Sequence, residues 1–218
     1  MCASECQTRD GCLSFSFTDG GQTCKTYSRL IGEKESAVVF NTTTYFSKVF
    51  VIQRRTSVVV DFMRNWNQYK NGFGDVLGNF WIGNDNLHLL ASTPRILRVE
   101  LEAWDGAKGY AQYFTFQVAN EEQYYRLTVQ GFSGTLSNDA LTYHNGSKFS
   151  TDDKDNDVSN LNCAASYQIG WWFKNCYDAN LNGVYRTAAH VGNNNAMLWK
   201  NFPSGTFTPL KKTKMMIR

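Results

Sequence analysis

The chain has 218 residues and a mass of 24.8 kDa, enough for one large domain or two small ones. Hydrophobic residues make up 42% and charged residues 19%, a composition that excludes disorder, coiled coils and collagen-like sequence. The net charge of +3 is not gathered into a basic block, which disfavours nucleic acid as a partner, and no apolar run reaches the roughly 18 residues of a membrane span.

Four of the six cysteines lie within the first 24 residues: Cys2, Cys6, Cys12 and Cys24. Their spacing lacks the paired short knuckles of a zinc site, so disulfides are favoured and an oxidising compartment is expected. A cytosolic protein with free thiols is the alternative. Two N-glycosylation sequons, at Asn41 and Asn145, agree with secretion. The start shows no signal peptide, so we expect a secreted or cell-surface glycoprotein whose start is incomplete.

In the first segment, residues 3–9 are expected to form a short helix. Residues 13–17 alternate as a strand, and the Asp19–Gly21 turn leads back towards Cys24.

After Lys48 the pattern predicts strands at residues 49–54 and 58–60, followed by a helix with Asp61 as its N-cap. One side of that helix carries Phe62, Trp66 and Tyr69. The apolar run at 80–82 precedes a stop at 83–85 and a short helix at 87–90.

Three alternating runs follow, joined by short turns, at residues 97–104, 114–118 and 125–129. They predict an antiparallel meander. From Gly131 to Asn162, 18 of 32 residues are Gly, Ser, Asn or Asp, and so long an irregular stretch is typically functional or pinned.

The irregular stretch carries four close aspartates, Asp152, Asp153, Asp155 and Asp157. Carboxylates and backbone carbonyls that converge on one point form the oxygen shell that Ca²⁺ prefers. An EF-hand is excluded because the required glycine and glutamate are absent from its sixth and twelfth positions. A solvated acidic turn is the alternative.

From residue 51 onward the sequence resembles the fibrinogen C-terminal-like domain found in ficolins, tachylectins, angiopoietins and tenascins. The resemblance covers about 170 residues in collinear order. The motifs that carry it are Val51-Ile-Gln-Arg-Arg55, Phe62-Met-Arg-Asn-Trp66, Tyr69-Lys-Asn-Gly-Phe-Gly74, Phe80-Trp-Ile-Gly-Asn-Asp-Asn86, Leu97-Arg-Val-Glu-Leu-Glu-Ala-Trp-Asp105, Tyr143-His-Asn-Gly146, Asn162-Cys-Ala164, Trp171-Trp172, Asn180-Leu-Asn-Gly183 and Trp199-Lys200. It implies an α+β fold with a central antiparallel sheet, short helices and a long irregular region that binds calcium and ligand.

The resemblance also implies specific sites. The family's structural Ca²⁺ site falls on the carboxylates of Asp155 and Asp157 and the backbone carbonyls of Ser159 and Leu161. Its disulfide falls on Cys163–Cys176, and its cis peptide on Asn175–Cys176.

In ficolin- and tachylectin-like members this cis bond lines a pocket for N-acetyl groups. Tyr167 matches an aromatic wall of that pocket, and the Cys176 N–H would donate to an acetyl oxygen. The other residues expected at the pocket are Asn175, Tyr177, Asn193 and Asn194. Tyr177 stands where those lectins have histidine, and Asn193 replaces an aromatic residue, which weakens the expectation of acetyl specificity. Ordinary packing of Tyr167 and Tyr177 is the alternative.

Residues 2–30 resemble an apple/PAN module, which would pair Cys2 with Cys24 and Cys6 with Cys12. We therefore expect a partial PAN-like segment at 1–48 and a fibrinogen-like domain at 49–218 without its usual N-terminal subdomain.

The predicted function is a secreted, calcium-supported recognition protein of the innate-immunity, lectin-like type that binds glycans or acetylated groups. The alternative is a module that binds a cell-surface receptor or matrix protein, and oligomerisation would raise its avidity. An enzyme is the distant alternative, since no catalytic motif is present and no catalytic residue is predicted.

Overall fold

The computed structural model describes residues 48–187, 194–205 and 208–218, together with the backbone of four short strands nearer the start. The chain divides into two compact units, Met1–Ser47 and Lys48–Arg218. Among the described residues there is no helix long and apolar enough to cross a bilayer.

In the first unit two antiparallel hairpins are described. β1 (Ser14–Phe17) pairs with β2 (Cys24–Tyr27), and β3 (Ala37–Phe40) pairs with β4 (Thr43–Phe46). The strand expected at 13–17 and its return towards Cys24 are confirmed. The expected helix at 3–9, the sequon at Asn41 and the side chains of the first four cysteines lie outside what is described.

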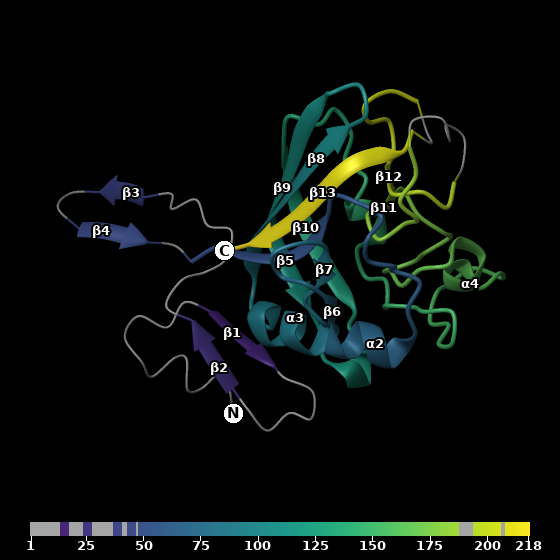
Figure 1. The fold of residues 1–218 in the computed structure, drawn as a ribbon, viewed down its shortest axis with the longest axis horizontal. Coiled ribbons are helices and arrows are strands. Elements are labelled where there is room, and N and C mark those ends of the chain that lie inside the picture. The colour runs from purple at the N-terminus through teal and green to yellow at the C-terminus, as the bar shows by residue number, and fades with distance from the viewer. Residues whose placement is uncertain are drawn as a thin grey trace. The chain divides into compact units, whose positions relative to one another are not determined.

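The second unit is built on one seven-stranded sheet, with strand order β10-β9-β8-β13-β5-β7-β6. Its strands are β5 (Phe50–Arg55), β6 (Phe73–Gly74), β7 (Phe80–Trp81), β8 (Arg95–Ala103), β9 (Lys108–Val118), β10 (Leu127–Gly134) and β13 (Leu210–Ile217). The strand β13 pairs antiparallel with both β5 and β8, so residues 210–217 close the middle of the sheet. Figure 1 shows β13 between β5 and β8.

The predicted meander is confirmed as β8, β9 and β10. Its alternation has the expected cause: Leu97, Val99 and Leu101 on β8 point into the core and are almost fully buried, while the residues between them point outward.

The helix predicted to start at Asp61 was placed too early. Helix α2 spans Trp66–Asn71, and Asn65 is its N-cap, with a capping box to Gln68. The Asp61 side chain instead accepts from the N–H of Met63 and forms a local turn. The three aromatic residues assigned to its buried side, Phe62, Trp66 and Tyr69, are all buried.

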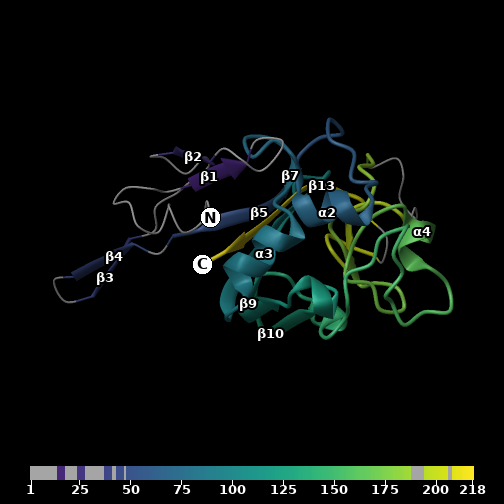
Figure 2. The same cartoon turned by 90° about the horizontal axis from the view of Figure 1, so that it is seen from below.

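Two further expectations were wrong in detail. Residues 58–60 form bends rather than a strand, because they have no partner strand among the described residues and Val59 is 83% exposed. Helix α3 spans Asn84–Ala91, so the expected stop at 83–85 is in fact the start of this helix. Figure 2 shows α2 and α3 along the same side of the sheet.

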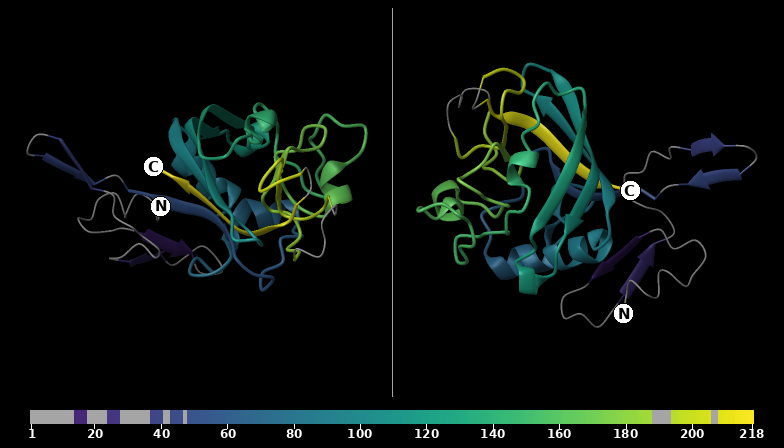
Figure 3. Two further views of the ribbon diagram at one scale, coloured as in Figure 1. Left: turned by 90° about the horizontal axis from the view of Figure 1, so that it is seen from above. Right: turned by 180° about the vertical axis from the view of Figure 1, so that it is seen from behind.

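The region after β10 is largely irregular, as expected. Its short elements are η2 (Thr142–His144), α4 (Cys163–Tyr167), β11 (Ala179–Asn180) and β12 (Leu198–Trp199), and η1 (Glu121–Gln123) lies before β10. β11 and β12 form a two-stranded pair. Both views of Figure 3 show this region gathered on one side of the sheet.

An aromatic core joins the irregular region to the sheet. Trp172 is fully buried and packs against Trp81 and Phe149, with ring centroids 5.9 and 5.3 Å away. Its indole N–H donates to the backbone carbonyl of Tyr125 over 2.8 Å. The irregular region is therefore part of the main core rather than an appended loop.

Candidate functional site

A disulfide closes the candidate site. Cys163 and Cys176 are bonded with an S–S distance of 2.02 Å, and the Asn175–Cys176 peptide is cis, as the family resemblance implied. Cys163 begins helix α4, whose N-cap Asn162 accepts from the N–H of Ala165 over 2.8 Å. The bond joins the end of the acidic loop to the segment that holds the cis peptide.

Three aromatic residues, Tyr167, Phe173 and Tyr177, form a cluster beside this disulfide, which we call the aromatic cluster. The rings of Tyr167 and Phe173 are stacked with centroids 6.1 Å apart, and Tyr177 meets Tyr167 edge-on at 4.8 Å. Phe173 is buried, whereas both tyrosines keep part of their surface exposed. Burial, followed by the proximity of Tyr167, raises the pKa of the Tyr177 hydroxyl, which donates to the Asn194 carbonyl.

The two sides of the cis peptide differ in their hydrogen bonding within the described part of the chain. The Asn175 carbonyl accepts from the Tyr143 hydroxyl over 2.9 Å. By contrast, the Cys176 N–H donates no hydrogen bond to any residue in the described ranges. The structure therefore brings Tyr167, Asn175, Cys176, Tyr177 and Asn194 together, while Asn193 lies outside the described residues.

His144 holds the segment around the cis peptide through hydrogen bonds to the backbone on both sides of it. It is fully buried, its Nδ1 lies 2.7 Å from the Trp172 carbonyl, and its Nε2 accepts from the N–H groups of Asp178 and Ala179. An imidazole that accepts at Nε2 must carry its proton on Nδ1, so Nδ1 donates to Trp172. Burial lowers the pKa of His144 to about 4, which keeps it neutral at physiological pH.

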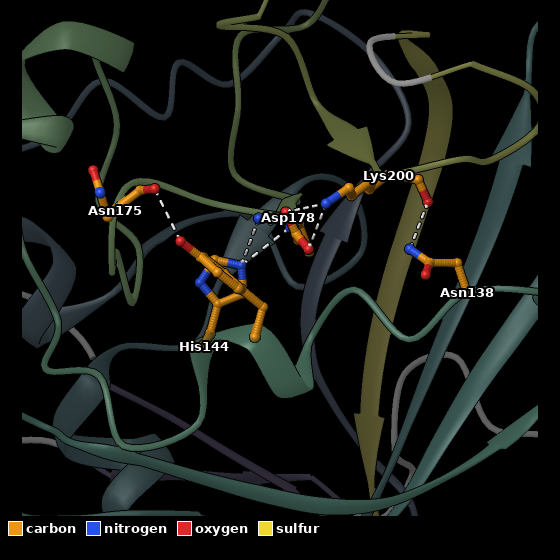
Figure 4. Close-up of polar contacts among 7 residues, drawn as sticks. Asn138, His144, Asn175, Asp178 and Lys200 are labelled. Atoms are coloured by element: carbon orange, nitrogen blue, oxygen red, sulfur yellow. Dashed lines mark hydrogen bonds and ion pairs between the residues drawn. The ribbon is translucent and has the colours of Figure 1, made fainter.

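A second support comes from an ion pair. Both carboxylate oxygens of Asp178 lie 3.0 Å from the Lys200 ammonium, and the Lys200 carbonyl accepts from Asn138. Figure 4 shows these contacts around Asn175, His144 and Asp178. The segment 175–179 is thus held by side chains from three separate parts of the sequence: Tyr143 with His144, Cys163, and Lys200.

The four aspartates of the acidic loop have different surroundings. Asp153 is structural, because its carboxylate accepts from the N–H of Trp66 at the start of α2 and from the Thr151 hydroxyl. Asp152 is exposed. Asp155 and Asp157 are joined by one hydrogen bond: the Asp155 carboxylate accepts from the Asp157 N–H over 3.1 Å.

The charge state of Asp157 reflects this pairing. Its carboxylate accepts from the N–H groups of Ser159 and Cys163 over 2.8 and 2.9 Å. Partial burial raises the pKa of Asp157 and the neighbouring Asp155 carboxylate adds to this, against the two N–H donors, which lower it. A cation beside these two neighbouring carboxylates would relieve the repulsion between their negative charges.

The donor set fits a calcium ion. Hard oxygen ligands suit Ca²⁺, and the carbonyls of Ser159 and Leu161 accept no hydrogen bond from any residue within the described ranges. In the same ranges, no group of three or more His, Cys, Asp or Glu side chains converges on one point. The expected site differs from such a group, since it combines two carboxylates with two carbonyls.

The second sequon precedes this loop in the sequence. The Asn145 carboxamide is half-buried, and its oxygen accepts from the N–H of Val129 over 2.9 Å. Modification at Asn145 stays a prediction.

Three supporting residues had no predicted role: Tyr143, Asp178 and Lys200. Tyr143 and Lys200 lie within motifs that carried the family resemblance, so the sequence signal was present. What it lacked was the contact, because both partners lie more than twenty residues away in the sequence.

Comparison with known proteins reveals clear relatives. The family model of the C-terminal globular domain of fibrinogen β and γ chains matches residues 9–218. Human angiopoietin-related protein 7 is 45% identical over 169 residues, which cover 77% of this chain and 49% of that protein. The chain therefore spans about half the length of that relative.

Solved structures agree with these matches. The fibrinogen-like globe domain of human ANGPTL2 has a TM-score of 0.75 and 31% identity, covering 99% of this chain and 95% of that one. Lamprey fibrin D-dimer in complex with the peptide Gly-His-Arg-Pro-amide has a TM-score of 0.70 and 25% identity, covering 99% and 72%. The family match includes most of residues 1–48, and nothing in these comparisons supports an apple/PAN-like module there.

Proposed function

Because the protein belongs to the family of the C-terminal globular domains of fibrinogen β and γ chains, we propose that it is an extracellular recognition module for a protein partner. The partner is a cell-surface receptor or a matrix protein. Binding, and not catalysis, is the activity, in keeping with the relatives and with a neutral, fully hydrogen-bonded His144.

One observation carries this proposal. The aromatic cluster leaves the tyrosine rings partly exposed in the same segment as the Cys176 N–H, which has no partner among the described residues, on a loop fixed by a disulfide. Partly exposed tyrosines supply large, rigid contact area, and a fixed N–H donor sets the orientation of a ligand. A preformed surface of this kind binds without a large ordering cost.

The relatives favour a protein ligand over a sugar. The human relative at 45% identity is an angiopoietin-related protein, and the lamprey structure holds a four-residue peptide as its ligand. Tyr177 packs edge-on against Tyr167 at the position where the acetyl-binding lectins have histidine.

A lectin-like function is the second candidate, and the Cys176 N–H is the observation that favours it. An N–H next to an aromatic ring can bind an N-acetyl group as well as a peptide carbonyl.

Calcium would support either function. Asp155 and Asp157 would hold the ion with the carbonyls of Ser159 and Leu161, and the ion would neutralise the carboxylates and stiffen the loop that ends at Cys163. Its role is structural. The protein's own residues make the ligand contacts.

The test is binding of the fluorescently labelled protein to a panel of cultured cells and cell-deposited matrix, with excess heparin present to mask anionic glycans. We expect saturable binding that trypsin treatment of the cells abolishes. Tyr177→Ala should weaken it at least tenfold, and Phe114→Ala is the matched control, since Phe114 is an exposed aromatic on the sheet.

Two results would contradict parts of this proposal. Binding that survives trypsin but is competed by free N-acetylated sugars would overturn the protein-partner proposal and support the lectin. Equal binding by Tyr177→Ala and the parent protein would remove the aromatic cluster from the interface. Calcium titration of Asp155→Asn against Asp152→Asn, followed by thermal unfolding, tests the metal separately.

A further inference from the structure

The outer face of the sheet carries a concentration of charge that the proposed function does not use. Cross-strand pairing places Lys214 of β13 opposite Glu100 of β8, and Lys212 opposite Glu102. On β9, Lys108 pairs with Glu102. Since side chains alternate along each strand, these residues share one face.

Two carboxylates form ion pairs with five cations on this face. Glu102 is approached by Lys211, Lys212 and Lys108, with N···O distances of 3.2, 3.1 and 3.9 Å. Glu100 pairs with Arg98 at 3.0 Å and with Lys214 at 2.8 Å. Each carboxylate is therefore shared, and the positive charge is only partly neutralised.

The net positive charge of the sequence is concentrated on this face. Five cations less two carboxylates leave a surplus of three on this face (5 − 2), which equals the +3 of the whole sequence. The remaining residues sum to zero. Arg54 also lines the groove and donates to the carbonyls of Val76 and Gly78, so it adds a further cation beside these five.

The face is hollowed and not flat. A groove of about 610 Å³ runs between these side chains and is lined also by Thr135 and Tyr110. The Arg98 guanidinium lies 3.7 Å from the centroid of the Tyr110 ring, which holds it in place. Lys108 has a side chain 72% exposed, whereas Glu102 lies beneath the lysines at 16%.

We propose that this groove, defined by Arg98, Lys108, Lys212 and Lys214, binds a sulfated glycosaminoglycan chain. Sulfate groups would compete with Glu100 and Glu102 for the shared cations. They would also neutralise the positive charge that the two carboxylates leave uncompensated. Thr135 and Tyr110 supply hydroxyl groups beside the cations for the sugar ring.

Two features select this occupant among polyanions. A disulfide-bonded protein belongs to an oxidising compartment, where sulfated glycans are the abundant linear polyanions and nucleic acids are scarce. A concave groove fits a single polymer strand, whereas a flat or convex face would fit an anionic membrane.

The test measures fluorescence anisotropy of a labelled heparin oligosaccharide with the 218-residue protein at physiological salt. The double variant K212Q/K214Q should bind about tenfold more weakly and with a shallower dependence on salt. The matched control R126Q/K148Q removes two exposed cations elsewhere and should bind like the parent protein. Thermal unfolding of all three proteins should coincide within a few degrees, because outward-facing ion pairs contribute little to stability.

Several outcomes would overturn the proposal. These are unchanged binding by K212Q/K214Q, equal affinity for desulfated heparin or for single-stranded DNA of the same length, and a preference for phosphatidylserine vesicles. Chelation of calcium should leave heparin binding unchanged, which separates this site from the proposed protein site.

Discussion

The sheet and the irregular region that follows it are held by different means. Each strand of the meander repeats one simple pattern, an apolar residue at every second position, and many residues contribute to its stability. The irregular region has no such repeat. Besides its aromatic packing, it is held by individual contacts: a disulfide, a buried histidine, an ion pair, two tryptophan hydrogen bonds and a few asparagine side chains. A site built this way depends strongly on single residues.

The largest expected effect tests whether the irregular region belongs to the core. Trp172→Ala removes a fully buried ring and its hydrogen bond to Tyr125, so we expect a loss of about 3–5 kcal/mol in the free energy of unfolding. Leu97→Ala in the sheet is the comparison, at about 2–5 kcal/mol. Urea unfolding measures both. A loss under about 1 kcal/mol for Trp172→Ala would show that the region packs independently of the sheet.

The disulfide should come next. Replacing Cys163 and Cys176 by serine opens a 14-residue loop and should cost about 3 kcal/mol. Hydrogen exchange should speed up between these residues while the strands β8 and β9 keep their protection at the global limit. Uniform loss of protection across both regions would instead show that they unfold as one unit.

Acid should act through His144. Its pKa is about 4 in the folded protein against about 6.5 unfolded, so the unfolded state binds more protons between these values and stability falls as pH falls below 6.5. The loss should reach about 2 kcal/mol at pH 5.

His144→Gln isolates this contribution. The variant should be less stable at pH 7 but should lose less stability between pH 7 and pH 5 than the parent protein, as measured by denaturant titration at each pH. Parallel pH profiles for the two proteins would assign the acid sensitivity to other groups.

The smallest effect tests a single side chain in the acidic loop. The Asn156 side-chain amide donates to the Phe149 carbonyl over 2.8 Å. In the sequence, Asn156 lies between Asp155 and Asp157. Asn156→Ala should cost about 1 kcal/mol, and exposed Asn160→Ala should cost less than about 0.5 kcal/mol. Differential scanning calorimetry can resolve the two. Equal values would mean that the loop is held by its backbone alone.

The same contrast explains what could be predicted from the sequence. The meander followed from alternation, because burial on one face is a local pattern. The helix at 66–71 was placed about one turn early, since Asp61 and Asn65 are equally good caps and only the capping box with Gln68 selects the second.

The site was predictable in its covalent part but not in its supports, and the calcium site at Asp155 and Asp157 stays a prediction. The Cys163–Cys176 bond and the cis peptide came from the family resemblance. The contacts of Tyr143 with Asn175 and of Lys200 with Asp178 join residues far apart in the sequence, and no local pattern encodes them. The outward-facing charges of β8 follow from its alternation, but β13 was not predicted from the sequence, and the shared carboxylates depend on its place beside β8.

The short helix η2 has a further consequence for measurement. Tyr143 within it contacts the Asn175 carbonyl, while the adjacent residues bond to the edge strand β10: the Leu127 carbonyl accepts from Gly146, and the Val129 N–H donates to Asn145. A ligand that moves the Asn175 carbonyl will therefore change the chemical environment of backbone amides on β10. The NMR resonances of Leu127 and Val129 can thus serve as a built-in sensor of occupancy, without a label on the ligand or on the loop.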